Sequence, residues 1–121
     1  MGDLDGVAFA VSIPQPWASI TVEGHRRYHS LTFRPPTIPL GKQIAIYSAV
    51  KADLEAADQA IHLLDSIGVT KAERLAWGTR TVRGAIIGVA TFAGVVAQSD
   101  DPWFVGPYAL WLTGADRKSV V

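Results

Sequence analysis

The sequence predicts a small α+β domain in which a curled, mostly antiparallel sheet packs against helices. Runs of apolar and β-branched residues recur between glycines and prolines, which is typical of several short strands. Residues 54–67 instead repeat apolar side chains at helical spacing. Residues 84–98 carry no charge and contain three glycines, so we expect one long strand that bends at Gly88 and Gly94, as strands of small barrels do. With 121 residues and 49% hydrophobic content, the chain suits a single domain over residues 1–121.

The composition excludes several functional classes. Eleven basic residues balance eleven acidic ones, so only a local patch could attract nucleic acid or an anionic membrane. Cysteine is absent, which excludes disulfides, thiolate metal sites and a cysteine nucleophile. The opening MGDLDG lacks the basic and apolar regions of a signal peptide, and no apolar run reaches membrane-spanning length. We therefore expect a cytoplasmic protein without a membrane partner.

The first part of the chain predicts a strand followed by a short helix. Residues 6–13 are rich in apolar and β-branched side chains and stop at Pro14, as a buried strand would. The helix is expected over residues 16–24, PWASITVEG. Its leading proline is tolerated in the first helical turn, and Gly24 stands where a left-handed C-cap belongs.

The middle of the chain predicts an extended segment, a loop and a strand. Residues 25–33 alternate well enough to be extended, whereas residues 34–41 contain three prolines, which favour a rigid loop over a central strand. Residues 42–50 predict the next strand, with Ile44 and Ile46 on one face.

Three elements are expected in the remainder besides the bent strand. Asp53 can cap the helix over residues 54–67, because aspartate accepts hydrogen bonds from the N–H groups of a first helical turn. Residues 70–83 begin with a weaker helical pattern that breaks at a glycine, which predicts a short helix or turn and then a loop. Residues 107–113 alternate apolar side chains and predict the last strand.

Three stretches of the chain resemble the ASCH domain family of the PUA-like superfamily. They are SIPQPWASITVEGHRRYHSLTFRPP at residues 12–36, IAIYSAVK at 44–51, and RGAIIGVATFAGVV with SDDPWFVGPYALWL within 83–112. The stretches occur in the family's order and cover nearly the whole chain. The resemblance implies a small PUA-like β-barrel of five to six mostly antiparallel strands flanked by two main helices. It also implies a cleft between the first helix and the barrel that binds RNA or a nucleotide-like ligand.

The chain departs from the family motif at the positions that carry chemistry. The family follows its first helix with Gly-x-Lys-x-x-Glu-x-Arg, and the same positions here hold Gly24, Arg26, His29 and Leu31. Some small members resemble amidohydrolases in which the lysine position is catalytic and the position of His29, there a threonine, is the nucleophile. An arginine cannot replace that lysine as a base, because a guanidinium stays protonated at physiological pH. The resemblance therefore implies the fold more than the catalysis.

The leading hypothesis is a module that binds RNA or a modified nucleoside in this cleft. Arg26 would contact a phosphate or a base acceptor, Gln15 would bind a base edge, and an aromatic ring such as Tyr108 would stack on a base. Trp17 is expected to lie half in the core, with Gln15 on the cleft wall. A purely structural role accounts for the same residues, since tryptophan usually packs in the core and charged residues often cover a strand edge.

The alternative hypothesis is a small hydrolase that acts on acetylated cytidine or on RNA. His29 would be the general base, and Arg26 or Lys51 would stabilise the developing negative charge. The motif has no second acid, which counts against RNA cleavage. Ser48 and Lys51 are the nearest candidates for the Ser-Lys pair that the family often directs at its cleft, although Lys51 can equally be an exposed residue.

Strict alternation would place Arg26 and His29 on opposite faces of the segment 25–33, whereas the family register brings both to one cleft, and the sequence leaves both arrangements open. The histidines lack metal-binding spacing, so no metal or cofactor is expected. A third hypothesis is a protein partner that adds a strand to the edge at residues 22–29, VEGHRRYH. No feature of the sequence specifies an oligomeric state.

Overall fold

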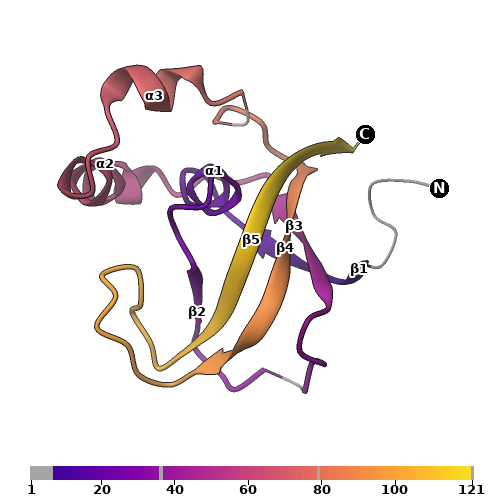
Figure 1. Cartoon of the computed structure of the whole chain (residues 1–121). Helices are drawn as coiled ribbons and strands as arrows, with labels where there is room; N and C mark the ends of the chain where they lie inside the picture. Colours follow the sequence, from indigo (N-terminus) through magenta and orange to yellow (C-terminus); the bar gives the residue numbers. More distant parts are fainter. Residues whose placement is uncertain (1–6, 36, 79, 121) are drawn as a thin grey trace.

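The computed structural model describes residues 7–35, 37–78 and 80–120, without the side chains of residues 8 and 118–120. It is an α+β fold in which one curled sheet forms a half-barrel and three helices gather on one side of it (Figure 1). The strands are β1 (Val7–Ile13), β2 (Tyr28–Leu31), β3 (Gln43–Ser48), β4 (Ala85–Val96) and β5 (Tyr108–Val120). The helices are α1 (Trp17–Val22), α2 (Ala57–Ser66), which follows the 3₁₀ turn η1 (Leu54–Ala56), and α3 (Lys71–Ala76).

The sheet is mixed and open. Its strand order is β1-β3-β4-β5-β2, with β1 and β3 parallel and the other three pairs antiparallel. Within the described residues β1 and β2 form the two edges and do not pair with each other, so the half-barrel is not closed. The mostly antiparallel sheet is confirmed, but the parallel pair was not expected from the sequence. Parallel neighbours need a crossover connection, which the chain supplies by running through α1 and β2 between β1 and β3.

The predicted bends of the long strand are confirmed. The pairing of β4 with β5 shifts register next to both Gly88 and Gly94, as β-bulges do. Gly88 also permits a close approach, since a Cβ there would lie 2.5 Å from the Asp116 carbonyl oxygen and 2.7 Å from Val22 Cγ1. The absence of a side chain at Gly88 therefore lets α1 pack directly on β4.

Helix α1 is the centre of the packing. It contributes to the main core between the helix and the sheet, whose buried members include Ile13, Val22, Ile46, Ile87, Phe92 and Leu112. Its other side joins a second cluster that connects α1 to α2 and to the β4–β5 loop, formed by Ile20, Ala60, Leu64, Val69 and Trp103. Gly24 ends the helix with φ +85°, which confirms the predicted left-handed cap. Both sides of α1 are therefore covered, and the polar residues Gln15 and Arg26 on either side of it are buried.

Helix α3 confirms the short helix or turn expected within residues 70–83, in addition to the two main helices. Two other predictions about the elements were wrong. Asp53 stands at the N-cap position of η1, but its side chain makes no capping hydrogen bond, and its carboxylate instead accepts from Trp17 Nε1 at 3.4 Å. The last strand does not end near residue 113 but continues as β5 to Val120, because main-chain pairing with β4 requires no apolar alternation. None of the helices in the described ranges is long and apolar enough to cross a membrane.

Candidate functional site

Arg26 is a buried cation at the end of the connection from α1 to β2. Its residue surface is only 9% exposed. Its Nη1 donates to Thr21 Oγ1 at 3.1 Å, and its Nη2 donates to His29 Nδ1 at 3.3 Å. No carboxylate of the described residues lies within ion-pair distance of the guanidinium. Burial lowers the pKa of Arg26 to about 10, so the group remains charged at neutral pH without a counterion.

His29 supports Arg26 as a neutral acceptor. A guanidinium can only donate, so the contact requires that His29 Nδ1 accepts and that the ring proton lies on Nε2. Burial and, to a smaller extent, the positive charge of Arg26 together lower the pKa of His29 to about 4. The pair therefore carries one positive charge at neutral pH, on Arg26.

Two tryptophans lie beside this charge. The guanidinium carbon of Arg26 is 5.7 Å from the centroid of the Trp17 ring, a cation–π geometry. The Trp17 ring meets Trp103 edge to face, with centroids 6.2 Å apart. Trp103 lies in the β4–β5 loop, where its main-chain N–H donates to Asp101 Oδ1 at 2.8 Å. Trp17 is half-buried, as the sequence predicts, and its ring connects the core to the surroundings of Arg26.

These side chains border a recess of about 230 Å³, which we call the Arg26 recess. Its wall includes Trp17, Arg26, Ser30, Gln59, Leu63 and Trp103. The wall is assembled from α1, β2, α2 and the β4–β5 loop, so segments far apart in the chain meet there. His29 contacts Arg26 without lining the recess. The arrangement combines aromatic surface, hydrogen-bonding side chains and one buried positive charge.

Gln15, which is expected to bind a base edge, lies buried at the start of α1, where its side chain contacts other parts of the chain. The residue is 5% exposed. Its Nε2 donates to the Val82 carbonyl oxygen at 3.0 Å, and its Oε1 accepts from the Ser19 N–H at 3.1 Å. Both ends of the carboxamide are therefore engaged within the chain, and they connect α1 to the segment before β4.

The other residues selected from the sequence lie apart from Arg26. Ser48 is completely buried, and its Oγ donates at 2.7 Å to the same Val82 carbonyl oxygen that Gln15 contacts. Lys51 is exposed beyond β3 and lines a separate surface hollow next to η1. Tyr108 lies at the start of β5, with the Arg34 guanidinium 5.8 Å from its ring centroid. The structure thus brings together Arg26, His29 and Trp17, but not Ser48, Lys51 or Tyr108.

Sequence reasoning missed the part of the wall that comes from α2. The sequence leaves two roles open for Trp103, because such aromatics usually pack in the core, whereas the neighbouring proline turn could present its ring to a base. Gln59 and Leu63 stand one helical turn apart, so they share a face of α2, but nothing in the sequence shows that this face meets Arg26. Among the described residues no group of three or more histidines and carboxylates is placed to hold a metal ion.

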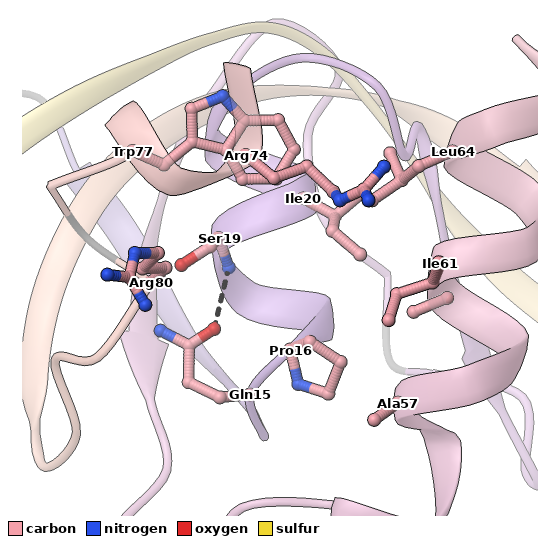
Figure 2. Close-up of a pocket in the computed structure, with 11 residues that line it drawn as sticks. Gln15, Pro16, Ser19, Ile20, Ala57, Ile61, Leu64, Arg74, Trp77 and Arg80 are labelled. Atoms are coloured by element: carbon pink, nitrogen blue, oxygen red, sulfur yellow. Dashed lines mark hydrogen bonds between the residues drawn. The ribbon is translucent and has the colours of Figure 1, made fainter. Parts of the chain in front are cut away.

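A second cavity, of about 160 Å³, lies between α1, α2 and α3, and we call it the apolar pocket. In Figure 2, Ala57, Ile61 and Leu64 project from α2 on one side of it. Gln15 and Ser19 lie on the other side, joined by their hydrogen bond. No described residue lines both this pocket and the Arg26 recess, so the two are separate sites.

Comparisons with protein-family models and with curated proteins find no match for this chain. The likeness to ASCH domains therefore remains an expectation from the quoted stretches of sequence. The function has to be inferred from the chemistry of the two cavities.

Proposed function

We propose that this protein binds single-stranded RNA or a nucleotide-like ligand in the Arg26 recess. The observation that carries the proposal is the buried Arg26 guanidinium, which has no carboxylate partner in the described part of the chain. Burial of a charge without a partner is unfavourable by about several kcal/mol, and an ion pair with good hydrogen bonds can offset this cost. A phosphate or a base carbonyl would supply the missing acceptor.

The donors of Arg26 suit such an acceptor. Thr21 and His29 take up one N–H from each terminal nitrogen, and the remaining guanidinium N–H groups have no acceptor among the residues described. Both of these partners are neutral, so they hold the guanidinium in position without cancelling its charge. Charge-assisted hydrogen bonds from arginine to phosphate are short and strong, and they favour this class of ligand over a neutral one.

The aromatic wall suits a nucleobase. Cavities of about 150 Å³ bind benzene in other proteins, so a recess of about 230 Å³ admits one larger planar ring system. The half-buried Trp17 offers ring surface, Trp103 contributes a ring that is only 6% exposed, and Gln59 and Ser30 supply side-chain hydrogen-bonding groups. Stacking of a base on an aromatic side chain contributes about 1–3 kcal/mol, which matters in a chain with no net charge to attract RNA.

The hydrolase hypothesis receives less support from the same geometry. A general base works best when its pKa lies near the operating pH, whereas the pKa of His29 is lowered to about 4. His29 Nδ1 is also occupied by Arg26, and Lys51 lies at another surface hollow. Binding is therefore the function that this geometry favours.

The proposal is tested by fluorescence anisotropy with a labelled single-stranded hexanucleotide RNA, with an unlabelled mononucleotide as competitor. Arg26→Met should weaken RNA binding by about tenfold to 100-fold, the loss expected for one charge-assisted contact. It should also reduce the slope of log affinity against log salt by about 0.7, the value for one phosphate of a single strand.

Arg27→Met is the matched control, because Arg27 is exposed and does not line the Arg26 recess. We expect it to change the affinity less than about threefold, as a peripheral charge does. Equal affinities of wild type and Arg26→Met for both RNA and mononucleotide would rule out the proposed function.

A further inference from the structure

The apolar pocket has walls and dimensions that suit a small organic group. Its volume of about 160 Å³ is close to that of cavities that hold one benzene ring, about 150 Å³. Pro16 and Ile20 close it on the side of α1, and Ala57, Ile61 and Leu64 close it on the side of α2. Trp77 adds an indole ring whose other neighbour is His25, stacked at a centroid distance of 5.6 Å.

One polar atom in this apolar wall has no partner. Ser19 is 2% exposed, and its Oγ makes no hydrogen bond in the described structure. Its backbone N–H is bound by Gln15, so the side chain is held at the pocket by a short, buried helix. In Figure 2 the Ser19 hydroxyl is directed to the side of the pocket where Arg80 lies, away from the side chains of α2. A buried hydroxyl without a partner is unfavourable, so the site favours a ligand that presents an acceptor there.

The charged side chains that line the pocket are both arginines. Arg74 is neutralised, because its Nη1 pairs with Asp65 Oδ1 at 2.9 Å and also donates to the Val69 carbonyl oxygen. Arg80 uses its Nε for the Leu75 carbonyl oxygen at 3.3 Å, and its terminal nitrogens make no hydrogen bond in the described residues. Arg80 is exposed, so its guanidinium is available at the mouth of the pocket. The wall of the pocket is almost entirely apolar, and the described groups that could bind a polar end of a ligand are the Arg80 guanidinium, which has no ion pair among the described residues, and the buried Ser19 hydroxyl.

We propose that the apolar pocket is a second binding site, which takes a small monocarboxylic acid with an aromatic or branched aliphatic body. The apolar body enters between α1 and α2, where it contacts Ile20, Ala57 and Ile61. The carboxylate accepts hydrogen bonds from Ser19 Oγ and from the terminal nitrogens of Arg80. A phosphate fits this site less well, because the described residues of the wall opposite Ser19 are apolar and offer no further donor.

The test is an NMR titration of the ¹⁵N-labelled protein with benzoate and, separately, with benzamide, which has the same ring without the charge. Benzoate should shift the amide signals of residues 57–64 and saturate at about millimolar concentration, as expected for a ligand of this size. Benzamide should bind at least about tenfold more weakly, because it lacks the charge-assisted contact. Equal affinities for the two compounds, or no shifts in α2, would overturn the proposal.

Three variants assign the contacts. Arg80→Gln should weaken benzoate binding by about tenfold and leave benzamide binding unchanged, and Ser19→Ala should weaken benzoate binding by about three- to tenfold. Ala57→Leu fills the pocket and should abolish binding of both compounds, while its thermal unfolding shows that the fold is kept. Arg83→Gln is the matched control, because Arg83 lines the adjoining hollow with Arg80 but not the apolar pocket. An equal loss in Arg80→Gln and Arg83→Gln would show that only the general surface charge matters, which would contradict the proposal.

Discussion

Gln15 and Arg26 flank the same short helix, and both are almost completely buried, but their surroundings differ. The Gln15 carboxamide has a main-chain acceptor at one end and a main-chain donor at the other. The Arg26 guanidinium has a hydroxyl, a neutral imidazole and a tryptophan face, but no anion among the described residues. Burial of a polar side chain therefore does not by itself identify a binding site. A satisfied group such as Gln15 holds segments of the chain together, whereas an incompletely satisfied group such as Arg26 indicates where a ligand can bind.

The largest effect is expected from acid, because protonation of His29 should destabilise the surroundings of Arg26. The pKa of His29 is about 4 in the folded protein and about 6.5 when unfolded, so the unfolded chain binds the proton first. The stability that neutral His29 contributes is complete above pH 6.5 and is lost as the pH falls toward 4, by up to about 3 kcal/mol. Urea denaturation at pH 7, 5.5 and 4 measures this loss.

His29→Gln isolates the contribution of His29 from that of carboxylates that titrate in the same range. Glutamine can still accept from Arg26 but does not titrate, so this variant should lose clearly less stability on acidification. His62→Gln is the control at an exposed histidine and should follow the wild type. If His29→Gln and the wild type lose stability equally, His29 is not the titrating group.

The second largest loss of stability is expected from removal of the Gln15 carboxamide. Gln15→Met replaces the carboxamide by an apolar side chain of similar length and leaves the Ser19 N–H unpaired in the interior. The free energy of unfolding should fall by about 2 kcal/mol, within the range for a buried donor without a partner. Chemical denaturation checks the value, and Gln59→Met, at an exposed position of α2, serves as the control, expected within about 0.5 kcal/mol of the wild type. A Gln15→Met protein as stable as the wild type would remove the structural role of this residue.

Arg26→Met should raise the free energy of unfolding, whereas Gln15→Met should lower it. The desolvation that lowers the pKa of Arg26 opposes folding of the charged form, and the replacement of a buried charge by an apolar side chain is often stabilising. We expect about 1 kcal/mol of added stability, because the lost contacts to Thr21 and His29 offset part of the gain. Thermal and urea denaturation of the ligand-free protein, with Arg27→Met as control, test this. A loss as large as that of Gln15→Met would show that the two residues are alike and that the comparison fails.

Ser48→Ala should have the smallest effect. The Val82 carbonyl oxygen keeps its contact with Gln15 Nε2, so loss of the hydroxyl contact should lower stability by only about 0.5 kcal/mol. In the Gln15→Met background the same change removes the second side-chain donor to that oxygen and should lower stability by more than about 1 kcal/mol. A double-mutant cycle measures the difference, and strict additivity would show that the two donors act independently.

Local features of the fold could be predicted from the sequence with success. Gly88 and Gly94 bend the long strand, and Gly24 ends the first helix, because a missing side chain changes the backbone wherever it occurs. The cap at Asp53 was predicted on the same local grounds and was wrong, since Trp17 competes for its carboxylate from a distant position. Strict alternation also misplaced Arg26, because the regular strand begins only at Tyr28 and leaves Arg26 free to meet His29.

The sequence by itself therefore determined the α+β class, the bent strand and the candidate site residues around α1. Only the tertiary structure decided which of those residues have partners. Gln15 reaches Val82 across 67 positions, and Trp17 meets Trp103 from the other end of the chain. The physical reason is that backbone preferences depend on near neighbours in sequence, whereas satisfaction of a buried polar group depends on atoms that only folding brings together.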